Sequence, residues 1–148
     1  MTPIVSTIEV ARPPEEVFSY VTDPTRFAEW QRDVVSVHAD SRGTPAVGSR
    51  FRTTRRIGGV ERTTTQQVTE LDAPRRWAAR GVDGPIRPSA TVTVEPIETG
   101  FRSRVTFTLD FEGHGVGVPL APLVRRQAEK GAPVSYRNLK ALLEGGSR

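Results

Sequence analysis

Residues 119–144, PLAPLVRRQAEKGAPVSYRNLKALLE, carry the longest helical pattern in the chain. At about 100° per residue, one stripe of this helix is apolar at both ends and polar or small at its centre. The stripe consists of Leu120, Leu123, Val124, Gln127, Gly131, Val134, Asn138 and Leu142. A helix that only fills a core normally has leucine or isoleucine at such central positions, because a buried amide costs free energy unless it is hydrogen-bonded. The pattern therefore predicts a helix over Pro119–Glu144 that covers a cavity.

A proline lies inside this predicted helix. Pro133 removes one backbone hydrogen bond and clashes with the carbonyl four residues earlier. The apolar stripe nevertheless continues across Pro133, so we expect one kinked helix rather than two separate ones.

Most of the chain before this helix alternates between apolar and polar residues, which is typical of half-buried strands. The most regular strand pattern is Phe101–Phe111, which we expect to turn Phe101, Ser103, Val105, Phe107, Leu109 and Phe111 inward. At roughly 3.4 Å per residue this strand spans about 36 Å, comparable to about 39 Å for the helix. Gly113, Gly115 and Gly117 then predict a flexible link into the helix.

A hairpin is predicted by Gly58-Gly59, between strands over Gly48–Ile57 and Val60–Leu71. A two-residue turn sets the register, which pairs Ile57 with Val60, Arg55 with Arg62, Thr53 with Thr64 and Phe51 with Gln66. Phe51 and Ile57 make this the inner face, and it is unusually polar for a core. The outer face pairs Arg56 with Glu61.

The remaining elements are shorter. A strand over Ile4–Ala11 is followed by two short helices, over Pro14–Val21 and Pro24–Gln31, the second capped by Asp23. The other strand patterns are Val34–Ala39, Arg76–Val82 with Trp77 inward, and Ala90–Glu95. We expect a loop over residues 83–88, because its two prolines do not fit a central strand.

Length and composition favour a single domain over residues 1–148. Cysteine is absent, which excludes disulfides and thiolate chemistry, and we find no signal peptide or transmembrane pattern. We therefore expect a cytoplasmic protein that is not integral to a membrane. We also expect it to be a monomer or a homodimer.

The net charge of the chain is +4, but the arginines are dispersed along the sequence, so we expect no nucleic-acid partner.

Motifs for hydrolytic, nucleotide or dinucleotide chemistry are absent from the sequence. Asp110, Glu112 and His114 have a spacing that resembles a metal site, but they share the outward face of a strand. Such residues are more often solvated, and we predict no metal and no cofactor.

Several segments of the chain carry a family resemblance: residues 8–18 (IEVARPPEEVF), 22–24 with Phe27 and Trp30, 48–51, 68–77 (VTELDAPRRW) and 138–144. They resemble the START-like, helix-grip superfamily (SRPBCC), which includes polyketide cyclases/dehydrases and lipid-transfer domains. The resemblance implies an α+β fold: a curved seven-stranded antiparallel sheet wrapped around the long C-terminal helix, with two short helices after the first strand. It also implies a cavity between sheet and helix for a hydrophobic small molecule, such as a lipid, a quinone or a polyketide.

The resemblance extends to candidate ligand-binding residues. Arg55 is similar in position to a cavity arginine of the polyketide aromatase/cyclases, and Thr53, Gln66, Ser103, Gln127 and Asn138 are candidate hydrogen-bonding partners. The predicted apolar and small contacts are Phe51, Trp77, Val92, Val105, Phe107, Val124 and Gly131. Because no inner strand position carries an obvious general base, we predict no catalytic residue.

Three functions remain open from the sequence. We expect a module that binds or carries a hydrophobic small molecule, which needs only an apolar cavity with a few polar groups. The alternative is a polyketide cyclase or dehydratase, which predicts that an ionisable group, Tyr20 or Tyr136, reaches the cavity. A protein-interaction domain would instead have a filled core and an exposed apolar patch.

Overall fold

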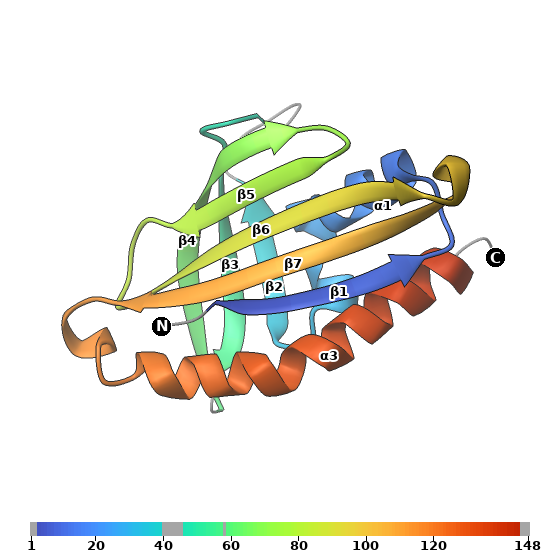
Figure 1. Ribbon diagram of the computed structural model, residues 1–148. Coiled ribbons are helices and arrows are strands. Elements are labelled where there is room, and N and C mark those ends of the chain that lie inside the picture. Colours follow the sequence, from blue (N-terminus) through green and yellow to red (C-terminus); the bar gives the residue numbers. More distant parts are fainter. Residues whose placement is uncertain (1–2, 40–45, 58, 146–148) are drawn as a thin grey trace.

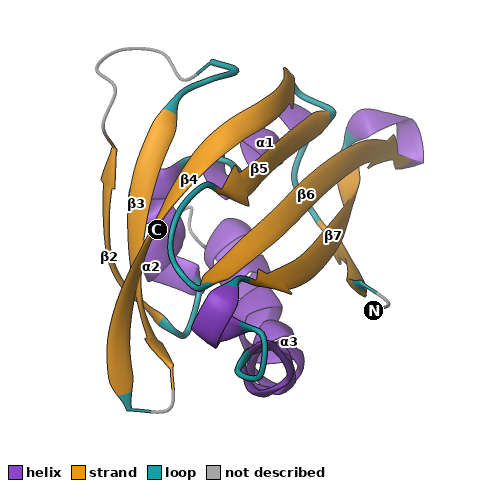
Figure 2. Ribbon diagram, turned by 90° about the vertical axis from the view of Figure 1, so that its left-hand side faces the viewer, coloured by secondary structure: helices purple, strands orange, loops and turns teal. Residues whose placement is uncertain are grey.

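The structure is a computed structural model that describes residues 3–39, 46–57 and 59–145. Seven antiparallel strands form one curved sheet in the order β1-β7-β6-β5-β4-β3-β2, and the long helix α3 crosses its concave side (Figures 1 and 2). The strands are β1 (Ile4–Val10), β2 (Val34–Ala39), β3 (Arg50–Ile57), β4 (Val60–Asp72), β5 (Arg76–Gly81), β6 (Ile86–Ile97) and β7 (Arg102–Gly113). The helices are α1 (Pro14–Val21), α2 (Phe27–Trp30) and α3 (Ala121–Gly145), with 3₁₀ turns η1 (Pro24–Arg26), η2 (Glu98–Gly100) and η3 (Gly115–Gly117). This architecture confirms the predicted fold class.

The segment between β1 and β2 forms as the sequence predicts. Helix α1 begins at Pro14, with Glu15 and Glu16 in its first turn, where acidic side chains favour the helix dipole. Asp23 caps the next turn by accepting a hydrogen bond from the Thr25 backbone N–H at 3.0 Å. The second short helix is divided into η1 and α2, and α2 brings Phe27 and Trp30 into the core.

The register predicted for the β3–β4 hairpin is confirmed. Ile57 pairs with Val60, and the predicted pairs continue to Phe51 opposite Gln66. Of the two turn glycines, Gly58 lies outside the described residues and Gly59 has a positive φ of 81°. On the outer face, Arg56 contacts Glu61 at 2.8 Å.

The loop predicted over residues 83–88 is shorter in the structure, because β6 already begins at Ile86 and contains Pro88. Pro88 pairs with Phe111 of β7, whereas pairing of β6 with β5 starts one residue later, at Ser89. On its β5 side the strand is therefore locally an edge, so the missing N–H of Pro88 interrupts no ladder. Gly81 lies against Pro88, where a Cβ would approach the proline ring to 2.8 Å.

Strand β7 runs from Arg102 rather than Phe101, and the prediction for Phe101 was wrong. Phe101 is 75% exposed after the tight turn η2, in which Glu98 and Thr99 both have positive φ. Phe101 directly follows this turn and precedes β7, so it does not take part in the strand alternation that predicts an inward side chain. The next inward positions, Ser103, Val105 and Phe107, are buried as predicted.

Helix α3 is one continuous helix that includes Pro133, and it bends along its length (Figure 1). Its buried stripe differs from the predicted one on both sides of Gly131. The buried residues of the helix are Ala121, Val124, Gly131, Ala132, Ser135, Tyr136 and Leu139. Asn138, by contrast, is exposed, and Leu123 and Leu142 are 62% and 40% exposed. The prediction followed large apolar side chains, whereas alanine, glycine and serine let the helix approach the sheet.

The glycines before α3 have a packing role in addition to the predicted flexibility. Gly117 is buried, and a Cβ built on it would lie 1.8 Å from the Pro85 carbonyl oxygen. Only glycine fits there, so this contact fixes the start of α3 beside the β5–β6 loop. Among the described residues, no helix combines the length and apolar character needed to cross a bilayer.

Candidate functional site

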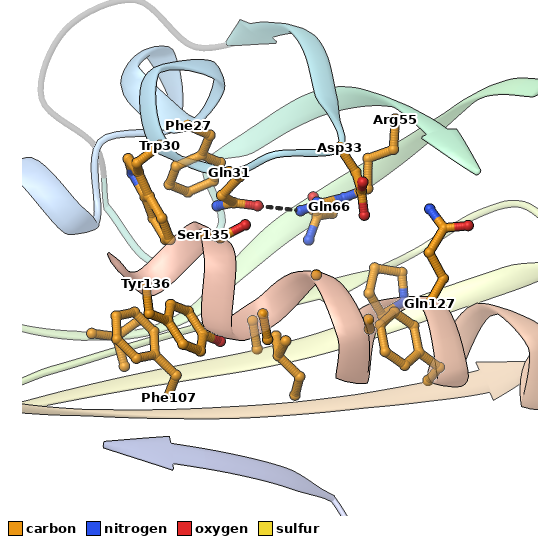
Figure 3. A pocket seen from close by; sticks show the side chains of 18 of the residues that line it. Phe27, Trp30, Gln31, Asp33, Arg55, Gln66, Phe107, Gln127, Ser135 and Tyr136 are labelled. Atoms are coloured by element: carbon orange, nitrogen blue, oxygen red, sulfur yellow. Dashed lines mark hydrogen bonds between the residues drawn. The ribbon is translucent and has the colours of Figure 1, made fainter. Parts of the chain in front are cut away.

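A cavity of about 120 Å³ lies between α3 and the concave side of the sheet (Figure 3). Its walls come from α2 and the segment after it, strands β3 to β7, and α3. Eight of the thirteen predicted ligand-binding residues line it: Arg55, Gln66, Trp77, Val92, Phe107, Val124, Gln127 and Gly131. Of the polar or small residues at the centre of the predicted helix stripe, Gln127 and Gly131 line this cavity, whereas Asn138 does not.

One part of the cavity, the aromatic end, is formed by Phe27, Trp30, Trp77, Phe107 and Tyr136. The Tyr136 ring stacks on Phe107, with ring centroids 4.0 Å apart and an angle of 13° between the planes. Phe27 contacts Trp30 and Trp77 edge to face, at centroid distances of 6.1 and 6.2 Å. Edge-to-face contacts are among the favoured aromatic geometries, and together with the stacked pair they make this end a packed apolar wall.

Trp30 is 4% exposed, and its indole Nε1 is buried without a hydrogen-bond partner among the described residues. An unsatisfied buried donor costs about 1–3 kcal/mol. The cavity wall therefore contains a buried N–H group that has no partner in the described part of the chain and is able to donate a hydrogen bond to a ligand.

The other part of the cavity, the polar end, consists of Gln31, Asp33, Arg55, Gln66 and Gln127. Arg55 Nη2 donates to Gln31 Oε1 at 2.7 Å, the bond drawn in Figure 3. Gln66 Oε1 accepts from the Thr53 hydroxyl at 2.9 Å. Gln127 Nε2 donates to the Arg56 backbone carbonyl at 3.1 Å, which links α3 to β3. Several polar side chains thus converge at one end of an apolar cavity.

The electrostatics of the polar end are dominated by Arg55 and Asp33. Burial lowers the pKa of the Arg55 guanidinium, and the charge of Asp33 opposes this shift. Arginine stays protonated throughout the physiological range, so Arg55 remains a half-buried cation. Burial also raises the pKa of the Tyr136 phenol, which the charge of Arg55 partly offsets. Tyr136 is therefore a neutral phenol at neutral pH.

The backbone around Asp33 is held from two sides. The Arg32 N–H donates to Ser135 Oγ on α3 at 3.0 Å, and the Arg56 N–H donates to the Asp33 carbonyl at 2.9 Å. On the helix side Gly131 leaves room for the carboxylate, because a Cβ there would lie 3.5 Å from Asp33 Oδ2. These contacts place an acidic side chain at the cavity from a segment outside the strands.

A second hollow, of about 310 Å³, adjoins the polar end and shares Arg55, Gln66 and Val124 with the cavity. Glu61 and Arg62 of the β3–β4 hairpin, with Pro85 of the β5–β6 loop, line its outer part. Arg62 is exposed, whereas Arg55 is half-buried between the two spaces. The polar end therefore adjoins a hollow that is lined in part by exposed residues of the hairpin.

Five predicted site residues lie elsewhere. Asn138 is exposed on α3, because the buried face of the helix contains Ser135, Tyr136 and Leu139 at this level. Ser103 is fully buried, with its hydroxyl donating to the Arg12 carbonyl at 2.8 Å. The other three are core residues that do not line the cavity, although one of them, Thr53, lines the second hollow: Phe51, Thr53 and Val105.

Sequence reasoning missed the polar residues that precede β2. Gln31 and Asp33 lie in a segment without periodicity, so no pattern assigns them a direction. Of the two tyrosines considered, Tyr136 lines the cavity. Tyr20 instead donates to Glu29 Oε1 at 2.7 Å, outside the cavity.

The three residues with metal-like spacing, at the end of β7 and directly after it, are engaged in separate pairs. Asp110 accepts from Arg125 at 3.0 Å, and Glu112 contacts His114 at 2.8 Å. No group of metal-ligating side chains is present in the described part of the chain.

A curved antiparallel sheet around a long C-terminal helix, with an apolar cavity between them, defines the helix-grip, START-like class. The sequence matches the family described as "Polyketide cyclase / dehydrase and lipid transport" over residues 1–144. The chain belongs to this family. Among curated proteins, none matches the sequence.

Solved structures with the same fold are similar over nearly the whole chain. The Zhui aromatase/cyclase from Streptomyces sp. R1128 has a TM-score of 0.82 and 17% identity, over 99% of this chain and 95% of its own. A START superfamily protein from Mycobacterium smegmatis has a TM-score of 0.80 and 17% identity, over 99% and 100%. The di-domain aromatase/cyclase BexL of the BE-7585A biosynthetic pathway has a TM-score of 0.69 and 24% identity, over 95% of this chain and 45% of its own. At these identities the likeness establishes the fold.

Proposed function

We propose that this protein binds or carries a hydrophobic small molecule in the cavity between the sheet and α3. The observation that carries the proposal is the division of one cavity into an aromatic end and a polar end. Ligand sites are typically apolar spaces with a few placed polar groups, and this cavity has that composition. A packed core would instead have no reason to turn Arg55 and Asp33 inward.

The size of the cavity limits how a ligand is accommodated. Sites for drug-sized ligands are typically about 300–1,000 Å³, and the inner cavity alone, at about 120 Å³, is smaller. The second hollow adds about 310 Å³ beyond Arg55 and Gln66. A ligand would therefore place an apolar ring at the aromatic end and extend past Arg55 toward the surface.

Native mass spectrometry of the purified protein, followed by titration with a fluorescent apolar probe, tests this proposal. We expect a co-purifying small molecule or saturable probe binding that weakens at least tenfold in Gly131→Leu and in Gln127→Leu. Asn138→Leu is the matched control, because it makes the same kind of change on the exposed face of the same helix, and its affinity should equal that of the parent. No binding, together with increased stability of both cavity variants, would show that the interior is a loosely packed core.

A second candidate function is that of a polyketide cyclase or dehydratase, which the ionisable side chains in the cavity support. Three ionisable side chains line the cavity: Asp33, Arg55 and Tyr136. Arg55 is a candidate to polarise a ketone oxygen, and Asp33 is the candidate to accept a proton. The test is incubation with a poly-β-keto thioester, in which the parent but not Asp33→Asn should accelerate formation of an aromatic product. A product profile equal to that of the uncatalysed reaction would reject the cyclase function and leave the binding function intact.

A further inference from the structure

The polar end of the cavity holds one charge of each sign. Of the described residues that line the cavity, Arg55 and Asp33 are the charged ones, and both are half-buried. Figure 3 shows both side chains on the same side of the cavity, opposite Tyr136 and Phe107. A ligand whose ring enters the aromatic end would therefore present its polar group to a cation and an anion together.

Arg55 and Asp33 do not form a direct ion pair with each other. Within the described residues, the Arg55 guanidinium donates to Gln31, and the charge of Asp33 acts on it without a hydrogen bond or ion pair between the two side chains. A guanidinium has five N–H groups and a carboxylate has two acceptor oxygens, so both retain bonding capacity. The site thus offers donors and acceptors simultaneously.

Such a pair discriminates between ligand head groups by charge. A carboxylate on the ligand is attracted by Arg55 but repelled by Asp33, and an ammonium experiences the reverse. In both cases the charged head group also loses its hydration on entering a partly closed site. A neutral group that accepts from Arg55 and donates to Asp33 satisfies both side chains without either repulsion.

The volume of the cavity limits the apolar part of the ligand. An apolar cavity of roughly 150 Å³ takes up one benzene molecule. The inner cavity, at about 120 Å³, is of that order, and its walls are aromatic. The buried part of the ligand is therefore about one ring.

From these observations we propose that the site selects a neutral ligand head group, one that both accepts and donates hydrogen bonds, attached to a single buried aromatic ring. Aryl carboxamides and hydroxyaryl ketones have this chemistry, whereas aryl carboxylates and aryl ammonium ions do not. The inference rests on the proposed binding function, because it concerns the same cavity.

Four probes of similar size test the inference by calorimetric titration at pH 7: benzamide, benzoate, benzylamine and toluene. Benzamide has a neutral head group, benzoate has a negative one and benzylamine has a positive one. Toluene has no polar head group, so its affinity measures binding to the apolar part of the cavity alone. We expect benzamide to bind at least tenfold more tightly than benzoate or benzylamine. Benzoate binding as tightly as benzamide would overturn the inference.

Charge variants sharpen the same experiment. Asp33→Asn is nearly isosteric and should raise benzoate affinity at least tenfold, while Arg55→Gln should do the same for benzylamine. Asp72→Asn is the matched control, because it makes an equal change of net charge at an exposed residue outside the cavity, and it should leave all four affinities unchanged. Unchanged benzoate affinity in folded Asp33→Asn would overturn the inference.

Failure of the inference can be distinguished from failure of the proposed function. If toluene binds in the parent but head-group charge has no effect, the cavity is a binding site and the inference alone is wrong. If none of the four probes binds, the proposed function and the inference fail together.

Discussion

The two ends of the cavity are held together by different forces. At the aromatic end, Phe107 and Tyr136 stack in a region where both rings are at least nine-tenths buried. At the polar end, Gln31, Asp33 and Arg55 are half-buried, and a hydrogen bond joins Arg55 to Gln31. Burial of large rings dominates folding stability, whereas a hydrogen bond contributes about 1 kcal/mol net. Substitutions at the aromatic end should therefore reduce stability, and substitutions at the polar end should mainly change ligand binding.

The largest effect is expected from removing a ring at the aromatic end. Phe107→Ala should lower the free energy of unfolding by about 3–5 kcal/mol, because it removes the stacking partner of Tyr136 and leaves a void. Urea denaturation measures this decrease in the free energy of unfolding. Phe101→Ala removes the same ring where it is 75% exposed, and should change stability by only about 0.5 kcal/mol. Equal effects of the two variants would contradict the contrast between a packed wall and an open surface.

A smaller loss is expected where α3 meets the polar end. Ser135→Ala leaves the Arg32 N–H without its acceptor and should lower the free energy of unfolding by about 1–2 kcal/mol. The control is Ser89→Ala, an exposed serine on the outer face of β6. Hydrogen exchange of the Arg32 amide should also become faster in Ser135→Ala, and an unchanged rate would show that this bond does not hold the segment.

A small gain in stability is expected from the glycine beside Asp33. Gly131→Ala should raise the free energy of unfolding by up to about 1 kcal/mol, because alanine is the better helix former. The added methyl group would lie 3.5 Å from Asp33 Oδ2, an ordinary contact. Thermal unfolding measures the change, with Gly145→Ala at the exposed helix end as the control. A loss of stability would mean that the polar end has no room for the methyl group.

A further effect expected is a dependence of stability on alkaline pH. Burial raises the pKa of Tyr136, and burial with the Glu29 hydrogen bond raises the pKa of Tyr20 to about 12. In the unfolded chain both phenols ionise near the ordinary value of about 10. The stability that the neutral phenols contribute is therefore complete below pH ~10 and declines as the pH rises toward the folded pKa values.

Urea denaturation at several alkaline pH values tests this expectation. Tyr136→Phe should reduce the decline in stability above pH ~10, because phenylalanine does not ionise. Tyr20→Phe should also reduce the decline in stability, independently of Tyr136, since Tyr20 lies outside the cavity. The same decline in the parent and in Tyr136→Phe would contradict the burial of this phenol.

The parts of the fold that the sequence predicts are those fixed by local chemistry. A two-residue Gly-Gly turn leaves one register for the hairpin, and the observed pairing of Arg55 with Arg62 follows from it. Proline at the start of α1 and the cap at Asp23 place the short helices for equally local reasons. Strand alternation then turns Trp77 and Phe107 inward.

The parts that the sequence does not predict depend on packing between distant segments. The exposed position of Asn138 follows from close approach of Ala132 and Ser135 to their neighbours, and small residues carry little signal in an apolar pattern. Asp33 reaches the cavity because backbone bonds to β3 and α3 hold its segment in place. These contacts join residues far apart in the chain, so no local pattern reveals them.

The placement of Trp30 and Trp77 has a spectroscopic consequence. They are the two tryptophans of the chain, and both line the cavity. Intrinsic tryptophan emission therefore comes entirely from the walls of the candidate site. Tyr136, whose ring lies 6.3 Å from that of Trp30, can transfer excitation energy to it. A molecule that enters the cavity should quench or shift this emission, so occupancy can be followed optically in the unlabelled protein.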